Sequence, residues 1–229
     1  MEFIKIQPNF GQWDIDQIIC DLKSLTETNG YDWKMWAQKG VVNTGKYAGL
    51  GGGDMNLTSN LTMYPSIHDR LWRHSGRRYQ DDAHVDDNDL YEMHPELEGT
   101  YLGVLIRKME SMHGPIRVRL HNRCMLHGLY WHHDAHAEVR HHLTLWTNPG
   151  HFLVWTDEKL KWSPTFDPEQ AKHEFKIWAK FIPVDGYFRT LSTGTVIHGV
   201  ANIGVGWEQP REEQSRCHLT FWPVIPSIR

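Results

Sequence analysis

Apolar residues recur at helical spacing near the start of the chain. The pattern begins after Asp14, a good N-cap because its carboxylate can accept hydrogen bonds from the first free backbone N–H groups. It ends before Asn29-Gly30, a pair that commonly terminates helices. The positions that form the apolar face are Ile15, Ile18, Ile19, Leu22 and Leu25. The pattern predicts a helix between Asp14 and Asn29, preceded by a short strand over Phe3–Ile6.

A second stretch of helical spacing follows Pro95. Proline fits the first turn of a helix because its missing N–H would be unpaired there anyway. The apolar stripe consists of Leu97, Tyr101, Leu105, Met109 and Met112. Gly114-Pro115 stops the pattern. We therefore expect a second helix that begins at Pro95 and packs this stripe into the core.

After Pro115 the apolar residues alternate with polar ones, which is the period of a half-buried strand. Ile116, Val118 and Leu120 alternate with Arg117, Arg119 and His121. Further strand-like runs cover 143–146, 152–155, 175–182, 194–200 and 217–222. Turn residues separate them, as in Thr147-Asn148-Pro149-Gly150. Many short strands with two outer helices predict a mainly β fold with flanking helices, namely a barrel or jelly roll.

Two other segments lack a clear period. Gly49-Leu50-Gly51-Gly52-Gly53-Asp54 has neither phosphate-binding nor dinucleotide-binding spacing, so we expect a mobile loop. Residues 66–98 are rich in charge and predict a solvated insertion, with a lid or substrate-recognition loop as the alternative. Arginines open this stretch and aspartates follow them, at Arg70, Arg73, Arg77, Arg78, Asp81, Asp82, Asp86, Asp87 and Asp89.

Length and charge narrow the function classes. The 229 residues suit one domain, with a helical and irregular N-terminal elaboration over 1–114 and a catalytic core over 115–229. A net charge of −4 gives no reason to expect a nucleic-acid or membrane partner. Three cysteines without metal-type spacing favour buried free thiols, and the absence of a leader or long apolar run favours a cytoplasmic protein. The oligomeric state is left open.

The histidines point to metal chemistry, because the chain has 16 of them. In Tyr130-Trp131-His132-His133-Asp134, His132 and Asp134 lie two apart, so on a strand both side chains point to one face. His133 would then point to the opposite face. A second histidine from a distant strand, His198 in Thr195-Val196-Ile197-His198, would complete two nitrogens and one carboxylate oxygen. That triad suits ferrous iron and leaves positions open for substrates.

Residues 115–223 resemble the aspartyl/asparaginyl β-hydroxylase-like group of iron- and 2-oxoglutarate-dependent oxygenases. The resemblance rests on motifs in the right order, over about half the chain. These are Arg117-Val118-Arg119-Leu120 with Trp131-His132-His133-Asp134, then Arg140-His141-His142-Leu143-Thr144-Leu145 with Thr147-Asn148-Pro149, then His198-Gly199-Val200-Ala201-Asn202-Ile203-Gly204 with Arg216-Cys217-His218-Leu219. The resemblance implies a double-stranded β-helix (a cupin-like jelly roll) and the ligands His132, Asp134 and His198.

The resemblance also implies a cosubstrate site. 2-Oxoglutarate would take two iron positions and leave one for O₂, and its far carboxylate needs a fixed cation. Arginine is preferred there because its planar fork pairs with both carboxylate oxygens, and Arg216 is our candidate. We expect a hairpin between strands ending near Asn202 and starting at Ser215 to place Arg216 beside His198. The resemblance places Arg140 and His142 at the cosubstrate's other end.

The implied activity is hydroxylation of an amino-acid side chain, free or in a peptide or protein, with release of succinate and CO₂. Trp131, Trp146 or Trp222 could form a wall of the substrate pocket. Two alternatives stay open. Two histidines and a carboxylate also suit a zinc-dependent hydrolase, although the helical H-E-x-x-H arrangement is absent. A non-catalytic, cupin-like binding module would keep the fold without the chemistry.

Overall fold

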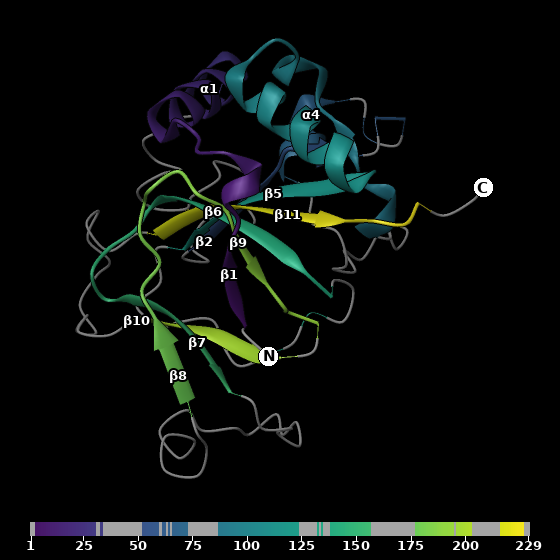
Figure 1. Ribbon diagram of the computed structural model, residues 1–229. Helices are drawn as coiled ribbons and strands as arrows, with labels where there is room; N and C mark the ends of the chain where they lie inside the picture. Colours follow the sequence, from purple (N-terminus) through teal and green to yellow (C-terminus); the bar gives the residue numbers. More distant parts are fainter. Residues whose placement is uncertain are drawn as a thin grey trace, which may run out of the picture.

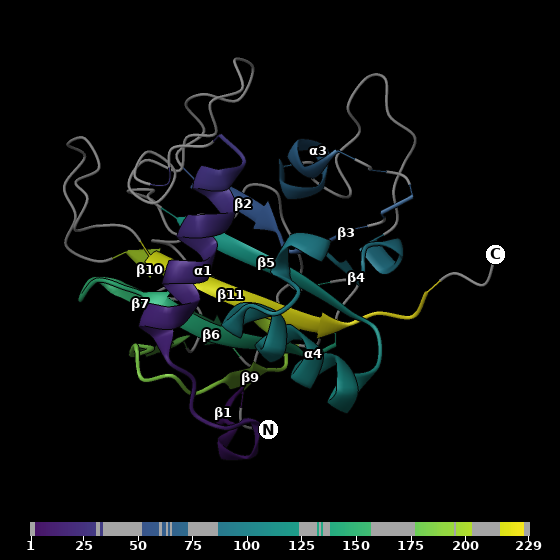
Figure 2. The same cartoon turned by 90° about the horizontal axis from the view of Figure 1, so that it is seen from above.

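The computed structural model describes residues 3–30, 33, 52–59, 61–62, 64, 66–72, 87–123, 132, 134, 138–156, 177–194, 196–202 and 216–226. Two antiparallel sheets lie one above the other, and two long helices cover the outer face of the larger one (Figure 1). The helices are α1 (Ile15–Thr28), α3 (Ile67–Trp72) and α4 (Tyr101–His113), with 3-10 turns η1 (Pro8–Phe10), η2 (Asp87–Asp89) and η3 (Pro95–Leu97). Figure 2 shows α1 and α4 lying across β5 and β11.

The larger sheet has six strands. In spatial order they are β1 (Ile4–Ile6), β9 (Arg189–Leu191), β6 (Arg140–Trp146), β11 (Arg216–Pro223), β5 (Ile116–Arg123) and β2 (Gly52–Asn56). The smaller sheet has the order β10 (Ile197–Asn202), β7 (His151–Thr156) and β8 (Ile177–Lys180). A separate two-stranded sheet pairs β3 (Thr58–Ser59) with β4 (Glu92–Met93).

From β5 onward the chain crosses repeatedly between the two sheets. His132 forms an antiparallel bridge with His198, so its segment lies beside β10 in the smaller sheet. The order β5-β11-β6-β9 then faces the order His132-β10-β7-β8, four positions in each layer. This is the strand order of a double-stranded β-helix, so the predicted jelly roll with flanking helices is confirmed.

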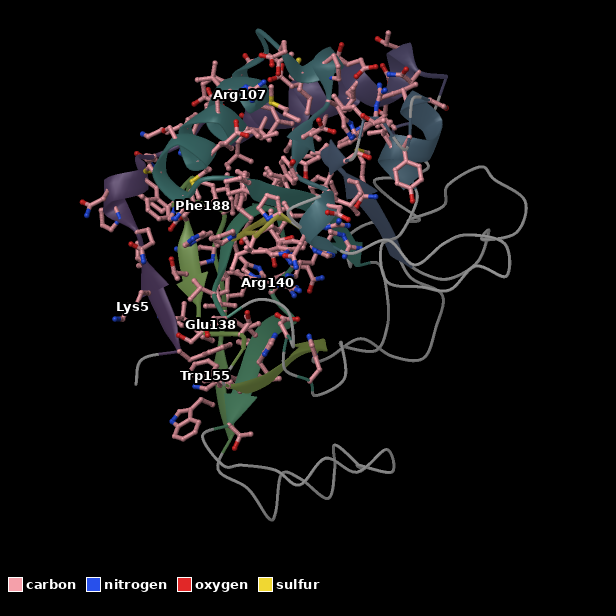
Figure 3. The ribbon with its side chains drawn as sticks, turned by 90° about the vertical axis from the view of Figure 1, so that its right-hand side faces the viewer. Lys5, Arg107, Glu138, Arg140, Trp155 and Phe188 are labelled. Atoms are coloured by element: carbon pink, nitrogen blue, oxygen red, sulfur yellow. The ribbon has the colours of Figure 1, made fainter. Side chains whose placement is uncertain are left out.

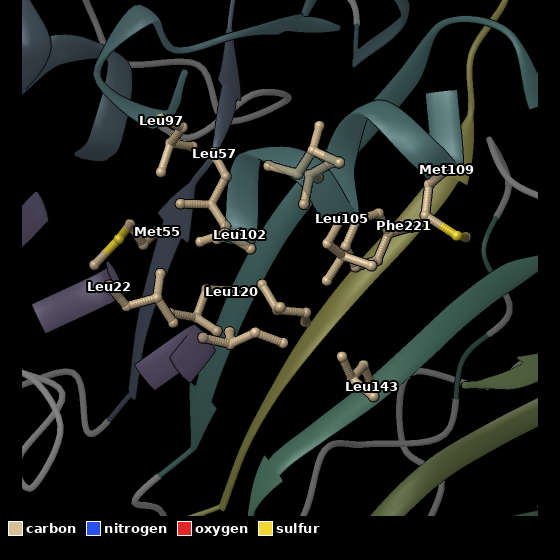
Figure 4. Packing of buried hydrophobic residues seen from close by; sticks show 14 of the residues in the cluster. Leu22, Met55, Leu57, Leu97, Leu102, Leu105, Met109, Leu120, Leu143 and Phe221 are labelled. Atoms are coloured by element: carbon tan, nitrogen blue, oxygen red, sulfur yellow. The ribbon is translucent and has the colours of Figure 1, made fainter. Parts of the chain in front are cut away.

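The main hydrophobic core lies outside the barrel, between the helices and the outer face of the larger sheet (Figure 4). Ile116, Val118 and Leu120 of β5 point into it and are at most 1% exposed, as the period-2 pattern predicts. A fully buried leucine contributes about 2 kcal/mol of transfer free energy. The opposite face of the same strands is left to polar side chains, and this face lines the space between the sheets.

Helix α1 follows its prediction, whereas α4 begins later than predicted. Asp14 caps α1 by accepting from the Gln17 N–H at 3.1 Å, and Gly30 ends the helix with φ 79°. Residues from Pro95 form only the turn η3, so the predicted start at Pro95 is wrong. Gly99 has φ 78°, which breaks the helical path, and Thr100 caps α4 by accepting from Gly103 N–H at 3.0 Å.

Three further expectations are corrected by contacts that no local pattern contains. Gly52 and Gly53 are not loop residues, because β2 pairs with β5; 49–51 lie outside the described residues. The charged stretch is not wholly solvated: Leu71 and His94 are 0% exposed, while 73–86 lie outside the described part. The lid alternative stays a prediction. The thiol of Cys20 is exposed, whereas Cys217 is buried.

The predicted hairpin between the His198 strand and the Arg216 strand is also wrong. β10 pairs with β7, whereas β11 pairs with β5 and β6, so the two strands belong to different sheets. Arg216 therefore reaches the interior from the opposite layer.

Within the described part of the chain, no helix is both long and apolar enough to cross a membrane. The N-terminal half also supplies strands, because β1 and β2 form the two edges of the larger sheet. The division into an elaboration and a core, and the single domain, stay predictions.

Two buried histidines predict acid sensitivity. Burial, and then the charge of Arg70, lowers the pKa of His94 to about 3; burial, and then His113, lowers that of His141 to about 4. In the unfolded chain these histidines take up protons near pH 6.5, whereas in the folded protein they stay neutral to a lower pH. The stability that is present above pH 6.5 is therefore lost as pH falls toward 4. His141 alone accounts for about 3 kcal/mol.

We expect His141→Gln to reduce this acid loss, measured by circular dichroism of the metal-free protein against denaturant at pH 7 and pH 4.5. Glutamine does not titrate and can still contact Thr190, whose Oγ1 lies 2.9 Å from His141 Nδ1. The half-exposed neighbour His113 gives the control His113→Gln, which should change the pH dependence less. An unchanged acid loss in His141→Gln would contradict the prediction.

Candidate metal site

His132, Asp134 and His198 converge on one point between the sheets. Their candidate ligand atoms all lie within 4.8 Å of one another. His132 Nε2 is 3.9 Å from Asp134 Oδ1, and His198 Nε2 is 3.7 Å from Asp134 Oδ2. Two ligand atoms each about 2.1 Å from a metal ion lie between about 3.0 and 4.2 Å apart for angles from 90° to 180°. Both separations fall in that range.

Backbone pairing positions these side chains. The His132 N–H donates to His198 O at 2.9 Å, and the His198 N–H donates to His132 O at 2.8 Å. The two residues therefore face each other as a hydrogen-bonded antiparallel pair. The Asp134 N–H donates to Thr193 O at 2.9 Å, which fixes the next position on the same face. The predicted convergence is present, while the assignment as ligands stays a prediction.

The donor atoms fit a cation. His198 Nδ1 lies 3.0 Å from Val196 O, so Nδ1 carries the proton and Nε2 presents its lone pair to the site. Burial, and then the charge of His132, lowers the pKa of His198 to about 4, which keeps the ring neutral at pH 7. Asp134 Oδ2 is buried and accepts no hydrogen bond within the described residues. A buried carboxylate oxygen in that position is suited to a metal ion.

Apolar and cationic neighbours enclose the triad. The Phe3 ring, 3% exposed, lies 5.6 Å from the His198 ring. Arg140 Nη2 lies 3.1 Å from Asp134 Oδ1. Figure 3 shows Arg140 lying between the two sheets. The side chains of Asp134 and His198 are 8% and 7% exposed, whereas that of His132 is 31% exposed. The site therefore opens on the side of His132.

A row of imidazoles leads from this site along the inner face of the larger sheet. The rings of His142 and His218 stack with centroids 4.9 Å apart, and His121 stacks on His218 at 5.4 Å. Arg216 Nη2 lies 3.5 Å from Nε2 of His218, the central ring of the row. Burial, and then the charges of Arg216 and Arg140, holds the pKa of His142 well below its usual range. The row is suited to an anion held by imidazoles and guanidinium groups.

Arg140 and Arg216 mark opposite ends of the inner face. In the β6–β11 pairing, His141 lies opposite Phe221 and Trp146 lies opposite Cys217. Arg140, at the start of β6, contacts Asp134 of the triad, whereas Arg216 lies beyond the other end of β6. This is the arrangement expected for a cosubstrate with a carboxylate at each end.

Some contributing residues were not anticipated. No sequence pattern identifies Phe3, Val196 or Thr193, because only tertiary pairing brings them to the triad. His218 could have been found, since period 2 places it on the face of Arg216. Trp146 packs against the outer core instead of the site, Trp222 is 1% exposed, and Trp131, His133 and His136 lie outside the described residues.

No protein-family model matches the chain, and no curated protein matches it. Among solved structures, it is similar to the non-heme alpha-ketoglutarate-dependent epimerase SnoN from nogalamycin biosynthesis (9% identity, TM-score 0.44, covering 97% of this chain and 79% of that chain). It is also similar to a prolyl-4-hydroxylase from Pseudomonas putida (13%, 0.42, 97% and 92%) and a 2OG-Fe(II) oxygenase-family oxidoreductase from Burkholderia pseudomallei (12%, 0.37, 92% and 89%). These TM-scores lie below 0.5. The fold is therefore assigned from the strand order of this chain, and its chemistry is inferred from the side chains at the site.

Proposed function

We propose that this chain is an iron(II)- and 2-oxoglutarate-dependent dioxygenase that hydroxylates an amino-acid side chain, free or within a peptide or protein. The observation that carries the proposal is the triad of His132, Asp134 and His198 on the same interior as the row of imidazoles, whose central ring, His218, contacts Arg216. Two imidazoles and one carboxylate suit iron(II) and leave three coordination positions. The proposal includes no nucleic-acid or membrane partner.

When bound, iron(II) with 2-oxoglutarate and O₂ supplies the oxidation of a C–H bond, with release of succinate and CO₂. The chain's own residues hold and orient these groups. Arg216 would pair with the far carboxylate of the cosubstrate through its fork, and His218 beside it would orient the guanidinium. His142 Nε2 is buried without a hydrogen-bond partner among the described residues, so it is available to the cosubstrate near the triad.

The side chains also control access. Asp134 and His198 are shielded from water, so the second substrate would approach past His132, the most exposed ligand. A dry site strengthens the electrostatic contacts that hold a charged cosubstrate. The row through His142 and His218 to Arg216 has a role in an oxygenase and none in a zinc hydrolase, which favours the oxygenase.

The testing experiment is anaerobic titration of the purified protein with Fe(II) and then 2-oxoglutarate, followed by an aerobic screen for succinate release. The screen compares free amino acids with short peptides. We expect 2-oxoglutarate to bind only after the metal, and one substrate class to raise succinate release. Retention of zinc without 2-oxoglutarate binding would favour the hydrolase. Binding of no metal would favour the non-catalytic module.

Arg216→Lys is expected to weaken 2-oxoglutarate binding about tenfold or more, because a lysine ammonium is a single point charge and cannot make the bidentate contact of a guanidinium. The metal affinity should stay the same, because Arg216 lies beyond the end of β6 opposite to Arg140, which contacts Asp134 of the triad. Both constants can be measured by anaerobic titration. The control is Arg107→Lys on the exposed side of α4, where Arg107 pairs with Glu98 and Glu110. An unchanged 2-oxoglutarate affinity in Arg216→Lys would move the role to Arg119 or Arg140.

A further inference from the structure

The guanidinium of Arg140 is held by contacts with Asp134 and Trp222. Its Nη2 lies 3.1 Å from Asp134 Oδ1, and its guanidinium carbon lies 4.6 Å from the centre of the Trp222 ring. Trp222 is 1% exposed, so the indole is a rigid surface. Trp222 lies near the end of β11, the neighbour of β6 in the larger sheet, and Arg140 begins β6. The sheet itself therefore holds the arginine against the tryptophan.

The two oxygens of Asp134 have different surroundings. Oδ1 lies 3.1 Å from Arg140 Nη2 and 3.9 Å from His132 Nε2. Oδ2 lies 3.7 Å from His198 Nε2 and accepts no hydrogen bond from the described residues, so only Oδ1 is held by a cation. The oxygens of a carboxylate are chemically equivalent, so only their neighbours decide which one is offered to a metal ion. Hydrogen-bonded partners commonly orient ligating carboxylates in this way.

From this asymmetry we infer that Arg140 is a positioning residue, held by Trp222, that restricts Asp134 to binding the metal through Oδ2 alone. The inference rests on the metal site of the proposed function. If Asp134 binds the metal through one oxygen, the triad occupies three coordination positions and leaves three open. If it binds through both oxygens, the triad occupies four positions and leaves two open. Arg140 thereby preserves the open positions that the proposed cosubstrate and O₂ require.

A lysine variant separates orientation from charge. Removing the cation altogether would also remove its repulsion of the metal ion, and the two effects would oppose each other. Arg140→Lys keeps the positive charge, but an ammonium group cannot both lie flat on Trp222 and direct a planar fork at Asp134. Any change in metal binding then reports the lost orientation.

The experiment titrates the full chain with Co(II) alone, without 2-oxoglutarate, and follows the visible absorption of the bound ion. We expect Arg140→Lys to raise the dissociation constant about tenfold and to change the absorption spectrum. Trp222→Leu should shift both in the same direction, with thermal melting as the check that it folds. The control Arg107→Lys, on the exposed side of α4 and away from the site, should leave both unchanged.

Each outcome bears on the inference. An unchanged constant and spectrum in Arg140→Lys would overturn it and leave Arg140 only a cosubstrate role. If the unaltered chain binds no Co(II), both the inference and the metal site fail. If the unaltered chain binds Co(II) and Fe(II) but the Fe(II) protein does not bind 2-oxoglutarate, the proposed function fails. The role of Arg140 is then still decided by the Co(II) titration.

Discussion

Replacing Asp134 with alanine should abolish succinate formation and weaken metal binding more than hundredfold, beyond the loss typical of residues that only support a ligand. The change removes the one carboxylate of the triad and leaves two imidazoles that face each other across a strand pair. It also takes away the carboxylate that lies 3.1 Å from the guanidinium of Arg140. Co(II) titration and succinate release under single-turnover conditions measure both effects.

The control is Glu138→Ala. Glu138 is a nearby carboxylate in the sequence, but its side chain is exposed, so the variant removes the same charge without touching the triad. It should bind metal as the unaltered chain does. Asp134→Asn tests the ligand more narrowly, because the amide keeps the size of the side chain without its charge. Full turnover in Asp134→Ala would exclude the triad from catalysis.

Gly103→Ala should lower the free energy of unfolding by about 3 kcal/mol, the cost of inserting an atom where packing leaves no room. In an ordinary helix interior this change stabilises by about 1 kcal/mol. Here a Cβ on Gly103 would lie 2.0 Å from the carbonyl oxygen of Leu97. That oxygen cannot move freely, because it accepts hydrogen bonds from Thr100 N at 3.1 Å and Thr100 Oγ1 at 2.8 Å.

Val104→Ala is the matched control on the next residue of α4. Val104 is 56% exposed, so shortening its side chain removes little buried surface and opens no cavity. Urea denaturation followed by circular dichroism should show a shift of less than about 0.5 kcal/mol for this variant. A Gly103→Ala protein as stable as Val104→Ala would show that η3 can move away from α4 at little cost.

The parts of the fold that sequence predicts well are those specified by neighbouring residues. Asp14 and Gly30 bound α1 because a cap and a positive φ depend on local chemistry. The alternation from Ile116 onward fixes which side of β5 faces the core. Sheet partners are different. β10 and β11 are consecutive strands, but each pairs with strands more distant in the chain, and no local pattern encodes that choice.

The candidate site shows the same division. The two-residue spacing of His132 and Asp134 is a local property, and the structure does place both beside His198. Phe3 reaches His198 only because β1 pairs with β9, and Val196 orients His198 only through the turn before β10. Arg140 also lies beside Asp134, and this contact depends on the position of β6 in the larger sheet, which the sequence does not give.

The pairing of β1 with β9 has a consequence for synthesis on the ribosome. Ile4 pairs with Leu191, so β1 has to wait until the residues up to Leu191 have been made before its partner exists. At about 5 to 20 residues per second, that interval is roughly 10 to 40 s. During it, Phe3 and Ile4 are apolar groups without their final neighbours. Phe3 packs on His198, so this wall of the metal site can form only after both β9 and His198 have been made.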